Sequence, residues 1–235
     1  MDAAAVIPAL DEEGAIGAVV RDLRQVRQPS GEPVLGEVVV ADNGSRDATG
    51  DRAREAGATV VWAPRRGYGS ACLAALRYLA ERAQGPPEAV VFVDGDGSND
   101  PAEVPLLLRP LEQEGFDLVI GARNALADPG SLTVPQRFGN RLATEIMNRV
   151  YGSSFSDLGP FRAVRWEALG RLDMADPDYG WTVEMQLKAA KLGLSVLEVD
   201  VRNLPRKAGR SKVAGTVRGV ASAGAKILYT LWKHR

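Results

Sequence analysis

The stretch AVVFVDGDGSND, Ala89–Asp100, decides how this chain folds. Its first five residues are apolar and mostly β-branched or aromatic, which is typical of a strand buried on both faces of a sheet. The strand passes directly into Asp94-Gly95-Asp96, where two carboxylates can approach one hard cation. Mg²⁺ takes oxygen ligands and keeps places for water and substrate phosphates, so the stretch predicts a metal site at Asp94 and Asp96. An ordinary Asp-Gly turn without a ligand is the alternative.

Outward from this stretch, the same alternation of a short apolar run and a polar cluster recurs along the first half of the chain. Segments with apolar residues at helical spacing separate the runs. This pattern predicts an α/β fold with a doubly wound, mostly parallel sheet flanked by helices, in which ligands bind beyond the carboxyl ends of the strands. The other expected strands are Ala3–Ile7, Glu37–Ala41, Ala58–Trp62 and Asp117–Gly121, and the expected helices are Glu13–Val26, Asp47–Ala56, Ser70–Arg82 and Pro101–Glu114.

The second half of the chain is less regular. The segment Arg123–Pro135 contains Pro and Gly and is interpreted as a mobile loop. We expect one domain over residues 1–212, followed by a C-terminal amphipathic helix over residues 213–235, either packed on the domain or lying at a membrane interface. Beyond the loop the pattern predicts helices at Gln136–Val150, Trp181–Leu192 and Val213–Trp232, an extended segment at Asp157–Val164 and a strand at Leu194–Val201.

Composition and sequence patterns argue against several classes of protein. The 235 residues carry a formal net charge of -1, which gives no argument for nucleic-acid binding. Cys72 is the only cysteine and is interpreted as a core residue, while His234, the only histidine, lies next to the C-terminus. Ser-His-Asp and Cys-His catalysis are therefore disfavoured. The sequence has no signal-peptide pattern and no run of about 18 apolar residues, so we expect a cytoplasmic protein, free or at the cytoplasmic face of the membrane.

Further polar clusters follow the other expected strands. Asp42 can accept hydrogen bonds from a base or ribose hydroxyl, while Ser45 or Asp47 can cap the next helix. Gly67, within RRGYG, either lets the backbone approach a phosphate closely or forms only a tight turn. The loop Arg206–Lys212 is dense in cations, and it either binds a phosphate group or is a solvated basic turn.

Taken together, these motifs resemble a known family. VIPALDEE, VVADNGSRDAT, RRGYGSA, VFVDGDGSNDPAE, LVIGAR and RKAGRSK occur in the order seen in family 2 glycosyltransferases. They look most like the dolichyl- or polyprenyl-phosphate mannosyl- and glucosyltransferase branch, and the likeness extends from about Ala5 to Lys212. The resemblance implies a GT-A fold, a UDP-, GDP- or dTDP-hexose donor, Mg²⁺ or Mn²⁺, and inversion at the anomeric carbon.

The resemblance also implies roles for individual residues by motif match. Three residues are expected to be catalytic, namely Asp96, Arg123 and Arg206, with Arg123 facing the reacting phosphates. The nucleoside would be held by Pro8, Ala9, Leu10, Glu12 and Asp42, and the metal and diphosphate by Asp94 and Asp96, while Arg206 and Lys212 would clamp a phosphate. Apart from the motif match, Gly67 and Gly95 are further candidates for binding the donor, and Arg137 and Arg162, which belong to the excess of cations in the acceptor half, are further candidates for binding the acceptor or its phosphate.

Three positions depart from the family pattern. Asp11 stands where the family often has Asn, and Ser98 stands where it often has a Gln that helps to bind the metal. The segment DLGPFR, Asp157–Arg162, replaces the Ser-Gly-Phe-Arg that is usual in phosphate-acceptor enzymes. The last departure concerns the acceptor and leaves the expected donor site unchanged.

The chemistry of the acceptor can be weighed from the residues themselves. A sugar hydroxyl needs a general base, for which Asp157 and Glu184 are available, whereas a lipid phosphate is already anionic and needs cations to position it. The excess of arginine and lysine in the second half of the chain, which would bind the acceptor, favours a polyprenyl phosphate. A soluble hydroxyl acceptor is the alternative. A basic, apolar C-terminal helix would then contact anionic lipid. A non-catalytic nucleotide-sugar-binding protein and a nucleotidyltransferase are further alternatives, the latter disfavoured because PALDEE is acidic.

Overall fold

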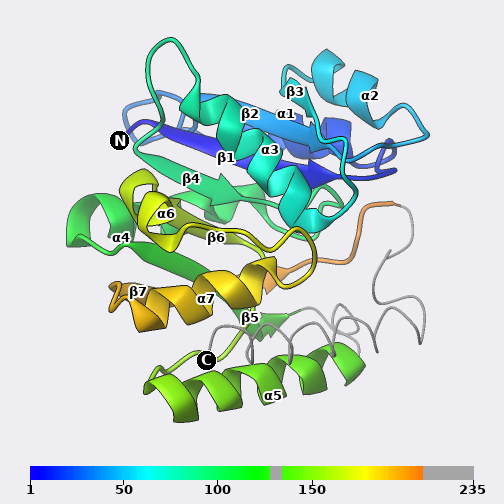
Figure 1. The fold of residues 1–235 in the computed structure, drawn as a ribbon. Helices are drawn as coiled ribbons and strands as arrows, with labels where there is room; N and C mark the ends of the chain where they lie inside the picture. The colour runs from blue at the N-terminus through cyan, green and yellow to red at the C-terminus, as the bar shows by residue number, and fades with distance from the viewer. Residues whose placement is uncertain (128–133, 209–235) are drawn as a thin grey trace.

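The computed structural model describes residues 1–127 and 134–208, with the backbone alone for residues 124, 125, 127 and 134–138. Seven strands form one sheet in the order β3-β2-β1-β4-β6-β5-β7, and helices cover both of its faces (Figure 1). All neighbouring strands run parallel except β6, which is antiparallel to both β4 and β5. The predicted doubly wound, mostly parallel α/β sheet is therefore confirmed. The strands are β1 Ala3–Ala9, β2 Glu37–Asp42, β3 Thr59–Trp62, β4 Ala89–Phe92, β5 Leu118–Ala127, β6 Arg162–Arg165 and β7 Val196–Asn203.

The helices divide into two layers because their apolar stripes meet opposite faces of the sheet. On one face α1 buries Ile16, Val19, Val20 and Leu23, the i, i+3, i+4, i+7 spacing of an amphipathic helix. Helices α2 and α4 share that core, whereas α3, α5, α6 and α7 bury their apolar residues in the core of the other face. The helices are α1 Ile16–Gln25, α2 Thr49–Glu55, α3 Tyr68–Ala80, α4 Val104–Glu114 after the 3-10 turn Pro101–Glu103, α5 Val134–Tyr151, α6 Trp166–Leu172 and α7 Trp181–Lys191.

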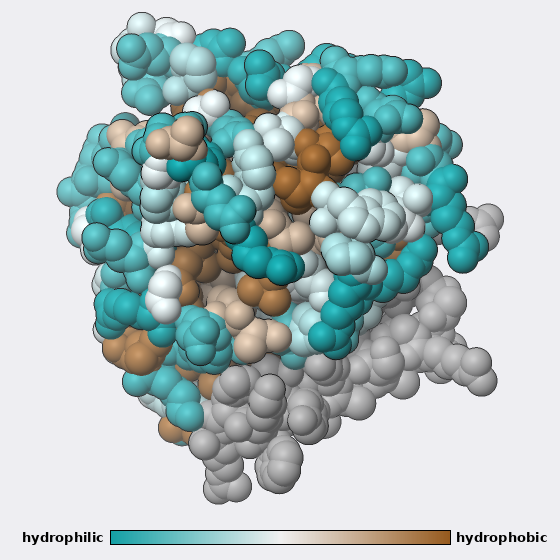
Figure 2. Space-filling model, turned by 45° about the horizontal axis from the view of Figure 1, so that its top comes forward, coloured by the Kyte–Doolittle hydropathy of each residue, from teal (hydrophilic) through white to brown (hydrophobic). Residues whose placement is uncertain are grey.

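The surface of this domain is mainly polar on the side drawn in Figure 2. Hydrophobic residues reach the surface there only in small separated groups, as is normal for a folded domain. No helix within the described ranges is long and apolar enough to cross a bilayer. The expected C-terminal helix over residues 213–235 lies outside the described residues.

Two expectations about local structure are wrong, and a third holds in part. The expected loop Arg123–Pro135 is strand as far as Ala127, where β5 pairs with β7, and helix from Val134, while residues 128–133 lie outside the described residues. Most of the expected extended segment Asp157–Val164 is a loop, and only its end forms β6. Ala48, at the N-cap position of α2, has no capping side chain, and Ser45 Oγ accepts from Asp11 N instead, but Asp47 Oδ1 accepts from the backbone N of Thr49, the first residue of the helix.

Candidate functional site

The loops after β1 and β2 are joined by hydrogen bonds in both directions. Asp11 N donates to Ser45 Oγ at 3.0 Å, and Arg46 N donates to Asp11 Oδ1 at 2.8 Å. Asp11 has a left-handed backbone with φ of 51°, which Asp and Asn tolerate better than other side chains. Glu12 N donates to Thr49 Oγ1 at 2.7 Å. The end of β1, with Pro8 and Ala9, and the loop after it, with Leu10 and Glu12, are therefore held beside Asp42 at one edge of the sheet.

Asp42 and Asn43 organise the end of β2. Asp42 Oδ1 accepts from Ser45 N at 2.9 Å, which fixes the turn, and Asp42 remains half-buried. Asn43 is buried, and its side chain donates to the carbonyls of Ala63 and Arg65 and accepts from Gly67 N at 2.7 Å. One amide side chain thus holds the loop after β3 against the loop after β2.

The glycines of the RRGYG segment make room for the protein's own backbone. Gly67 has φ of 136°, and a Cβ added there would overlap the carbonyl of Pro177. At Gly69 a Cβ would overlap the carbonyl of Asp176, and Ser70 N donates to Pro177 O at 2.8 Å. The side of Gly67 on which a Cβ would project is therefore filled by the loop before α7 and closed to a nucleotide, and contact of the donor with the rest of Gly67 stays a prediction.

The two aspartates after β4 lie in a tight loop at the carboxyl edge. Asp94 N donates to Asn99 Oδ1 at 2.8 Å, and Ser98 N donates to Asp96 Oδ1 at 2.8 Å. Gly95 packs over Ile7 and Ile16, so the loop rests on β1 and α1. Burial of the carboxyl group, and after it the negative charge of Asp96, raises the pKa of Asp94 to about 7. The site therefore holds two carboxylates that repel each other and favour a bound cation.

Tyr68, at the start of α3, reaches the first of these aspartates. Its hydroxyl donates to Asp94 Oδ1 at 3.4 Å. Burial, and then the charge of Asp94, raises the pKa of Tyr68 well above its usual value, so the hydroxyl remains a donor. Sequence reasoning missed this residue, because an aromatic after a Gly-rich turn carries no signal that it will point at a carboxylate.

Arg206 bridges the loops after β1 and β4 from the far end of the chain. Its Nη1 donates to Asp96 Oδ2 at 2.5 Å, and its Nη2 donates to Glu12 Oε1 at 2.6 Å. The segment that carries it is held by Leu204 N to Ser98 O at 2.9 Å and Lys207 N to Asp96 O at 3.0 Å. In Figure 1 this segment (orange) runs from β7 towards the loops of the other half of the sheet. Two residues predicted for different roles, Glu12 and Arg206, are thus in direct contact.

The donor set at Asp94 and Asp96 fits Mg²⁺ or Mn²⁺. Carboxylate oxygens are the ligands that these ions prefer, and two protein ligands leave positions for water and a diphosphate. Within the described ranges no group of three or more His, Cys, Asp or Glu side chains is arranged around one point. An ion held here would therefore share its coordination between the protein and a phosphate-bearing ligand.

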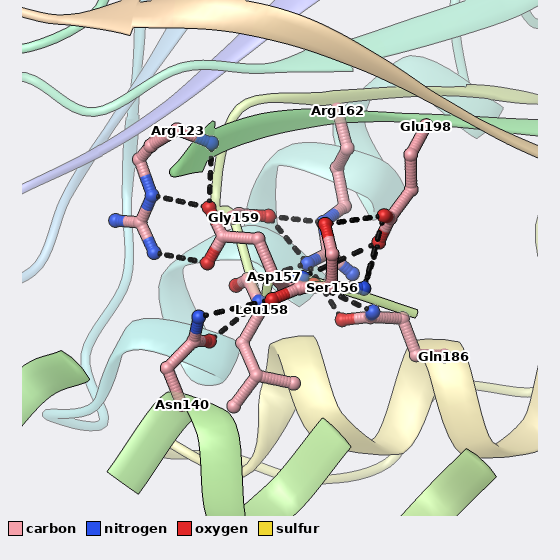
Figure 3. Close-up of polar contacts among 9 residues, drawn as sticks. All are labelled: Arg123, Asn140, Ser156, Asp157, Leu158, Gly159, Arg162, Gln186 and Glu198. Carbon is pink, nitrogen blue, oxygen red and sulfur yellow. Dashed lines mark hydrogen bonds and ion pairs between the residues drawn. The ribbon is translucent and has the colours of Figure 1, made fainter. Parts of the chain in front are cut away.

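Arg123, on β5, is held by Asp157 through three hydrogen bonds (Figure 3). Its backbone N and its Nε donate to Asp157 Oδ2 at 2.9 and 2.8 Å, and Nη2 donates to Oδ1 at 2.8 Å. Burial would raise the pKa of Asp157, but the hydrogen bonds and charge of Arg123 outweigh it and lower the pKa. The positive charge of Arg123 also acts on Asp94, where it opposes the rise in the pKa of that carboxyl.

Arg162 does not face the site. It is fully buried, and its guanidinium donates to the carbonyls of Leu158, Gly159 and Thr182 and to Gln186 Oε1. Burial lowers its pKa to about 10. The prediction that Arg162 binds a phosphate is therefore wrong, because its donors are used to hold the loop before β6.

Glu184, like Arg162, is engaged in contacts within the protein. It is buried on α7, where it pairs with Lys188 at 2.9 Å and accepts from the backbone N of Ala175 and Asp176. It therefore shapes the loop that packs on Gly67 and Gly69. Of the remaining candidates, Arg137 lies on α5 but its side chain is outside the described part of the chain, as is all of Lys212.

Comparisons with known proteins agree with this geometry. The family model described as glycosyl transferase family 2 matches residues 4–172. An uncharacterized glycosyltransferase of Mycobacterium tuberculosis is 38% identical over 216 residues, covering 91% of this chain and 90% of the relative. The undecaprenyl-phosphate mannosyltransferase of Micrococcus luteus is 30% identical, covering 92% of this chain and 89% of the relative.

A solved structure has the same fold over almost the whole chain. Glucosyl-3-phosphoglycerate synthase from Mycobacterium tuberculosis, in complex with Mn²⁺, UDP-glucose and phosphoglyceric acid, superimposes with a TM-score of 0.77 at 26% identity. The match covers 99% of this chain and 79% of that structure's chain. That protein therefore binds a divalent metal and a nucleotide sugar on a fold of this kind.

Proposed function

This chain belongs to glycosyl transferase family 2, and we propose that it moves a hexose, with inversion, from a nucleotide sugar to a polyprenyl phosphate. The proposal of a phosphate acceptor rests on one observation, which is that the two candidate bases, Asp157 and Glu184, are already engaged within the protein. Both oxygens of Asp157 accept from Arg123, and Glu184 is buried in a loop contact. Neither is placed to take a proton from a hydroxyl, whereas an anionic phosphate needs none removed.

The donor would lie along the edge formed by β1, β2 and β4. Pro8, Ala9 and Leu10 lie at the end of β1 and directly after it, and Asp42, paired with Ala9 at the end of β2, would accept a hydrogen bond from a ribose or base hydroxyl. The diphosphate would then reach the loop of Asp94, Gly95 and Asp96. A bound Mg²⁺ or Mn²⁺ supplies charge neutralisation of the leaving nucleoside diphosphate.

Two arginines would supply the cations for the reacting phosphates. Arg123 is fixed by Asp157 close enough to influence the Asp94 carboxyl. Arg206 bridges Glu12 and Asp96 and can exchange those partners for phosphate oxygens, which guanidinium groups bind in the same forked geometry. Their role is to hold an anionic nucleophile and a leaving group against each other while charge develops.

A soluble acceptor is the second candidate. The solved relative that superimposes on this chain holds phosphoglyceric acid, a small phosphorylated acid, whereas the undecaprenyl-phosphate mannosyltransferase uses a lipid. Both molecules bring an anion to the acceptor side, so Arg123 serves either. The two candidate acceptors differ in the attacking oxygen. The phosphate oxygen of a lipid phosphate is already anionic, whereas the hydroxyl of a soluble acceptor would still require a base.

A lipid acceptor would also require contact with a membrane. The last 23 residues, Val213–Arg235, combine apolar positions with Lys226, Lys233 and Arg235. Such a segment can lie at an anionic lipid surface, and we propose that it does. Flotation with anionic liposomes, comparing the full chain with one ending at Lys212, tests this. Recovery of both chains only in the lipid-free fraction would contradict it.

The acceptor assay decides between the candidates. Purified protein with Mn²⁺ is given UDP-, GDP- and dTDP-hexoses, first alone and then with polyprenyl phosphate, with the matching polyprenol, or with 3-phosphoglycerate. We expect transfer to polyprenyl phosphate and none to polyprenol, because only the phosphate is an anionic nucleophile. Transfer to 3-phosphoglycerate alone would establish the soluble acceptor, and binding of sugar nucleotides without transfer or hydrolysis would indicate a non-catalytic binder.

A further inference from the structure

We propose that Asp157 is a positioning residue, which aims Arg123 at the reacting phosphates instead of acting as a base. The proposal rests on the function proposed above. Figure 3 shows Asp157 facing Arg123 across the gap between β5 and the loop before β6, with the third guanidinium nitrogen, Nη1, on the side away from Asp157.

The hydrogen bonds fix the whole orientation of Arg123. The pair of bonds from Nε and Nη2 sets the plane of the guanidinium, and the bond from the backbone N ties Asp157 to the strand itself. A forked pair of this kind allows one geometry only. Arg123 is therefore locked at both ends of its side chain, and Nη1 is left in a fixed direction.

The loop around Asp157 is held in turn by side chains from four separate elements. Glu198 of β7 accepts from Ser156 N at 3.0 Å and from Ser156 Oγ at 2.7 Å. Asn140 of α5 accepts from Leu158 N at 2.7 Å, and Gln186 of α7 donates to Asp157 O at 2.9 Å. Arg162 of β6 donates to Gly159 O at 2.9 Å.

Ordering each of these polar side chains costs conformational entropy. The number of contacts that hold this loop therefore indicates that its position matters for function. A base needs an accessible oxygen and room to receive a proton, but Asp157 is fully buried and both its oxygens are occupied. A cation that must meet developing charge benefits from rigid placement, since small displacements reduce the rate steeply. The buried and fully paired Asp157 therefore fits rigid placement of Arg123 and does not fit proton transfer.

The pairing of Asp157 with Arg123 also gives the acceptor side a distinct chemistry. With Asp157 neutralised by Arg123, the pair presents the guanidinium edge and no free carboxylate to a ligand. An anionic oxygen is attracted there, whereas a neutral hydroxyl gains only a donor and loses its base. Asp157 thereby contributes to the choice of an anionic acceptor without touching it.

A double-mutant cycle tests the proposal. The variants are Asp157→Asn, Arg123→Gln and the pair together, with Ser156→Ala as the control that removes one support of the same loop and leaves the Asp157 carboxylate in place. For transfer to polyprenyl phosphate we expect each single change at Arg123 or Asp157 to lower kcat/KM by about 10- to 100-fold, the range seen when a catalytic group is misplaced. The double variant should be no slower than Arg123→Gln, and Ser156→Ala, which loosens the same loop but keeps the Asp157 carboxylate, should lose less activity than Asp157→Asn.

The pH profile separates positioning from proton transfer. A positioning residue leaves the shape of log kcat/KM against pH unchanged in Asp157→Asn, whereas loss of a base would abolish the acidic limb. Multiplied losses in the double variant, or an abolished acidic limb, would overturn the proposal.

A spectroscopic measurement keeps the test independent of turnover. The Nε–H signal of Arg123, identified by its loss in Arg123→Gln, should exchange slowly with water and should shift and exchange faster in Asp157→Asn. If no acceptor accepts sugar, the proposed function fails while this measurement still decides the positioning. An Nε–H signal that is unaffected by Asp157→Asn would refute it.

Discussion

The guanidinium of Arg206 and the carboxylate of Asp96 lie 2.5 Å apart, although 109 residues separate them in the sequence. A divalent ion needs the same carboxylate. Arg206 and the ion are therefore alternative partners of Asp96, and we expect Arg206→Ala to tighten Mn²⁺ binding in the absence of nucleotide. The gain should be about three- to tenfold, corresponding to a partly buried ion pair of about 1 kcal/mol. Titration monitored by the electron paramagnetic resonance of Mn²⁺ measures it.

Arg202→Ala is the matched control for that change. Arg202 pairs with Asp100 at 3.3 Å, in the loop that also carries Asp96, but it is half exposed. Its removal takes one positive charge from the same region without freeing a metal ligand, so Mn²⁺ affinity should stay nearly constant. Equal effects of the two substitutions would mean that general electrostatics, not competition for Asp96, controls the ion.

Removal of the metal or of its ligand should abolish transfer. Asp96→Asn should lower kcat by about two or more orders of magnitude, since the charge that develops on the leaving diphosphate loses its stabilisation. Excess EDTA should have the same effect on the original chain, and added Mn²⁺ should reverse it. Asp100→Asn is a control in the same loop, because Asp100 caps the turn at Ala102 and does not contact Asp96 in the described contacts. Full activity in EDTA would exclude a metal requirement.

Asp42 should contribute to donor affinity through its charge and its second oxygen. Asp42→Asn keeps the oxygen that accepts from Ser45 N, so the turn survives while the charge is lost. We expect binding of the nucleoside diphosphate to weaken by about 1–3 kcal/mol, the cost of leaving buried polar groups without a partner. Isothermal titration with UDP and GDP measures this. An unchanged dissociation constant for both, with the turn intact, would remove Asp42 from the donor site.

The glycine at position 69 should be essential for stability. A Cβ there would overlap the Asp176 carbonyl, and backbone cannot retreat as a flexible side chain can. We expect Gly69→Ala to destabilise the fold by about 1–3 kcal/mol or more, the usual cost of overpacking. Gly139→Ala is the matched control, since Gly139 lies within α5 and no atom of the described residues is within 4 Å of an added Cβ. It should gain about 0.5–1 kcal/mol through helix propensity. Urea unfolding gives both values, and equal values would contradict the packing argument.

The ion pair of Arg123 and Asp157 should appear in acid unfolding. The folded-state pKa of Asp157 is lowered, so the pair contributes stability above the unfolded pKa of about 3.9 and loses it as the pH falls through the folded value. Asp157→Asn removes a contribution that exists only at the higher pH. The difference in unfolding free energy between the two chains should therefore be large at pH 7 and shrink towards pH 3. A difference that is constant with pH would mean that the charge of Asp157 contributes nothing.

The sequence predicted the first half of the fold well because buried parallel strands read as continuous apolar runs. Ala89–Phe92 and Glu37–Asp42 lie within about a residue of the expected strands. Helix α6 was missed because Trp166–Leu172 has only seven residues, too few to establish a period. The antiparallel direction of β6 was also beyond reach, since four apolar and basic residues carry no sign of direction.

The grouping of the candidate residues was predicted where a motif stands at a strand end, and it failed where contacts with distant segments decide. Asp94, Asp96, Glu12 and Arg206 come together, and the order of motifs was sufficient for that. Gly67 and Arg162 were assigned to ligands because a Gly-rich turn and an arginine are common at phosphate sites. Their partners, Pro177 and the carbonyls around Gly159, come from elsewhere in the chain, and no local pattern reveals such packing.

The position of β6 in the sheet has a consequence for synthesis on the ribosome. It lies between β4 and β5, yet it begins at Arg162 whereas β4 ends at Phe92. While the intervening residues are translated, β4 has an unpaired edge of backbone donors and acceptors, and β5 has no partner. Such edges recruit other strands and promote aggregation. Nascent chains that stall within α5 should therefore aggregate. Once Arg165 has left the exit tunnel, β6 can pair with β4 and β5.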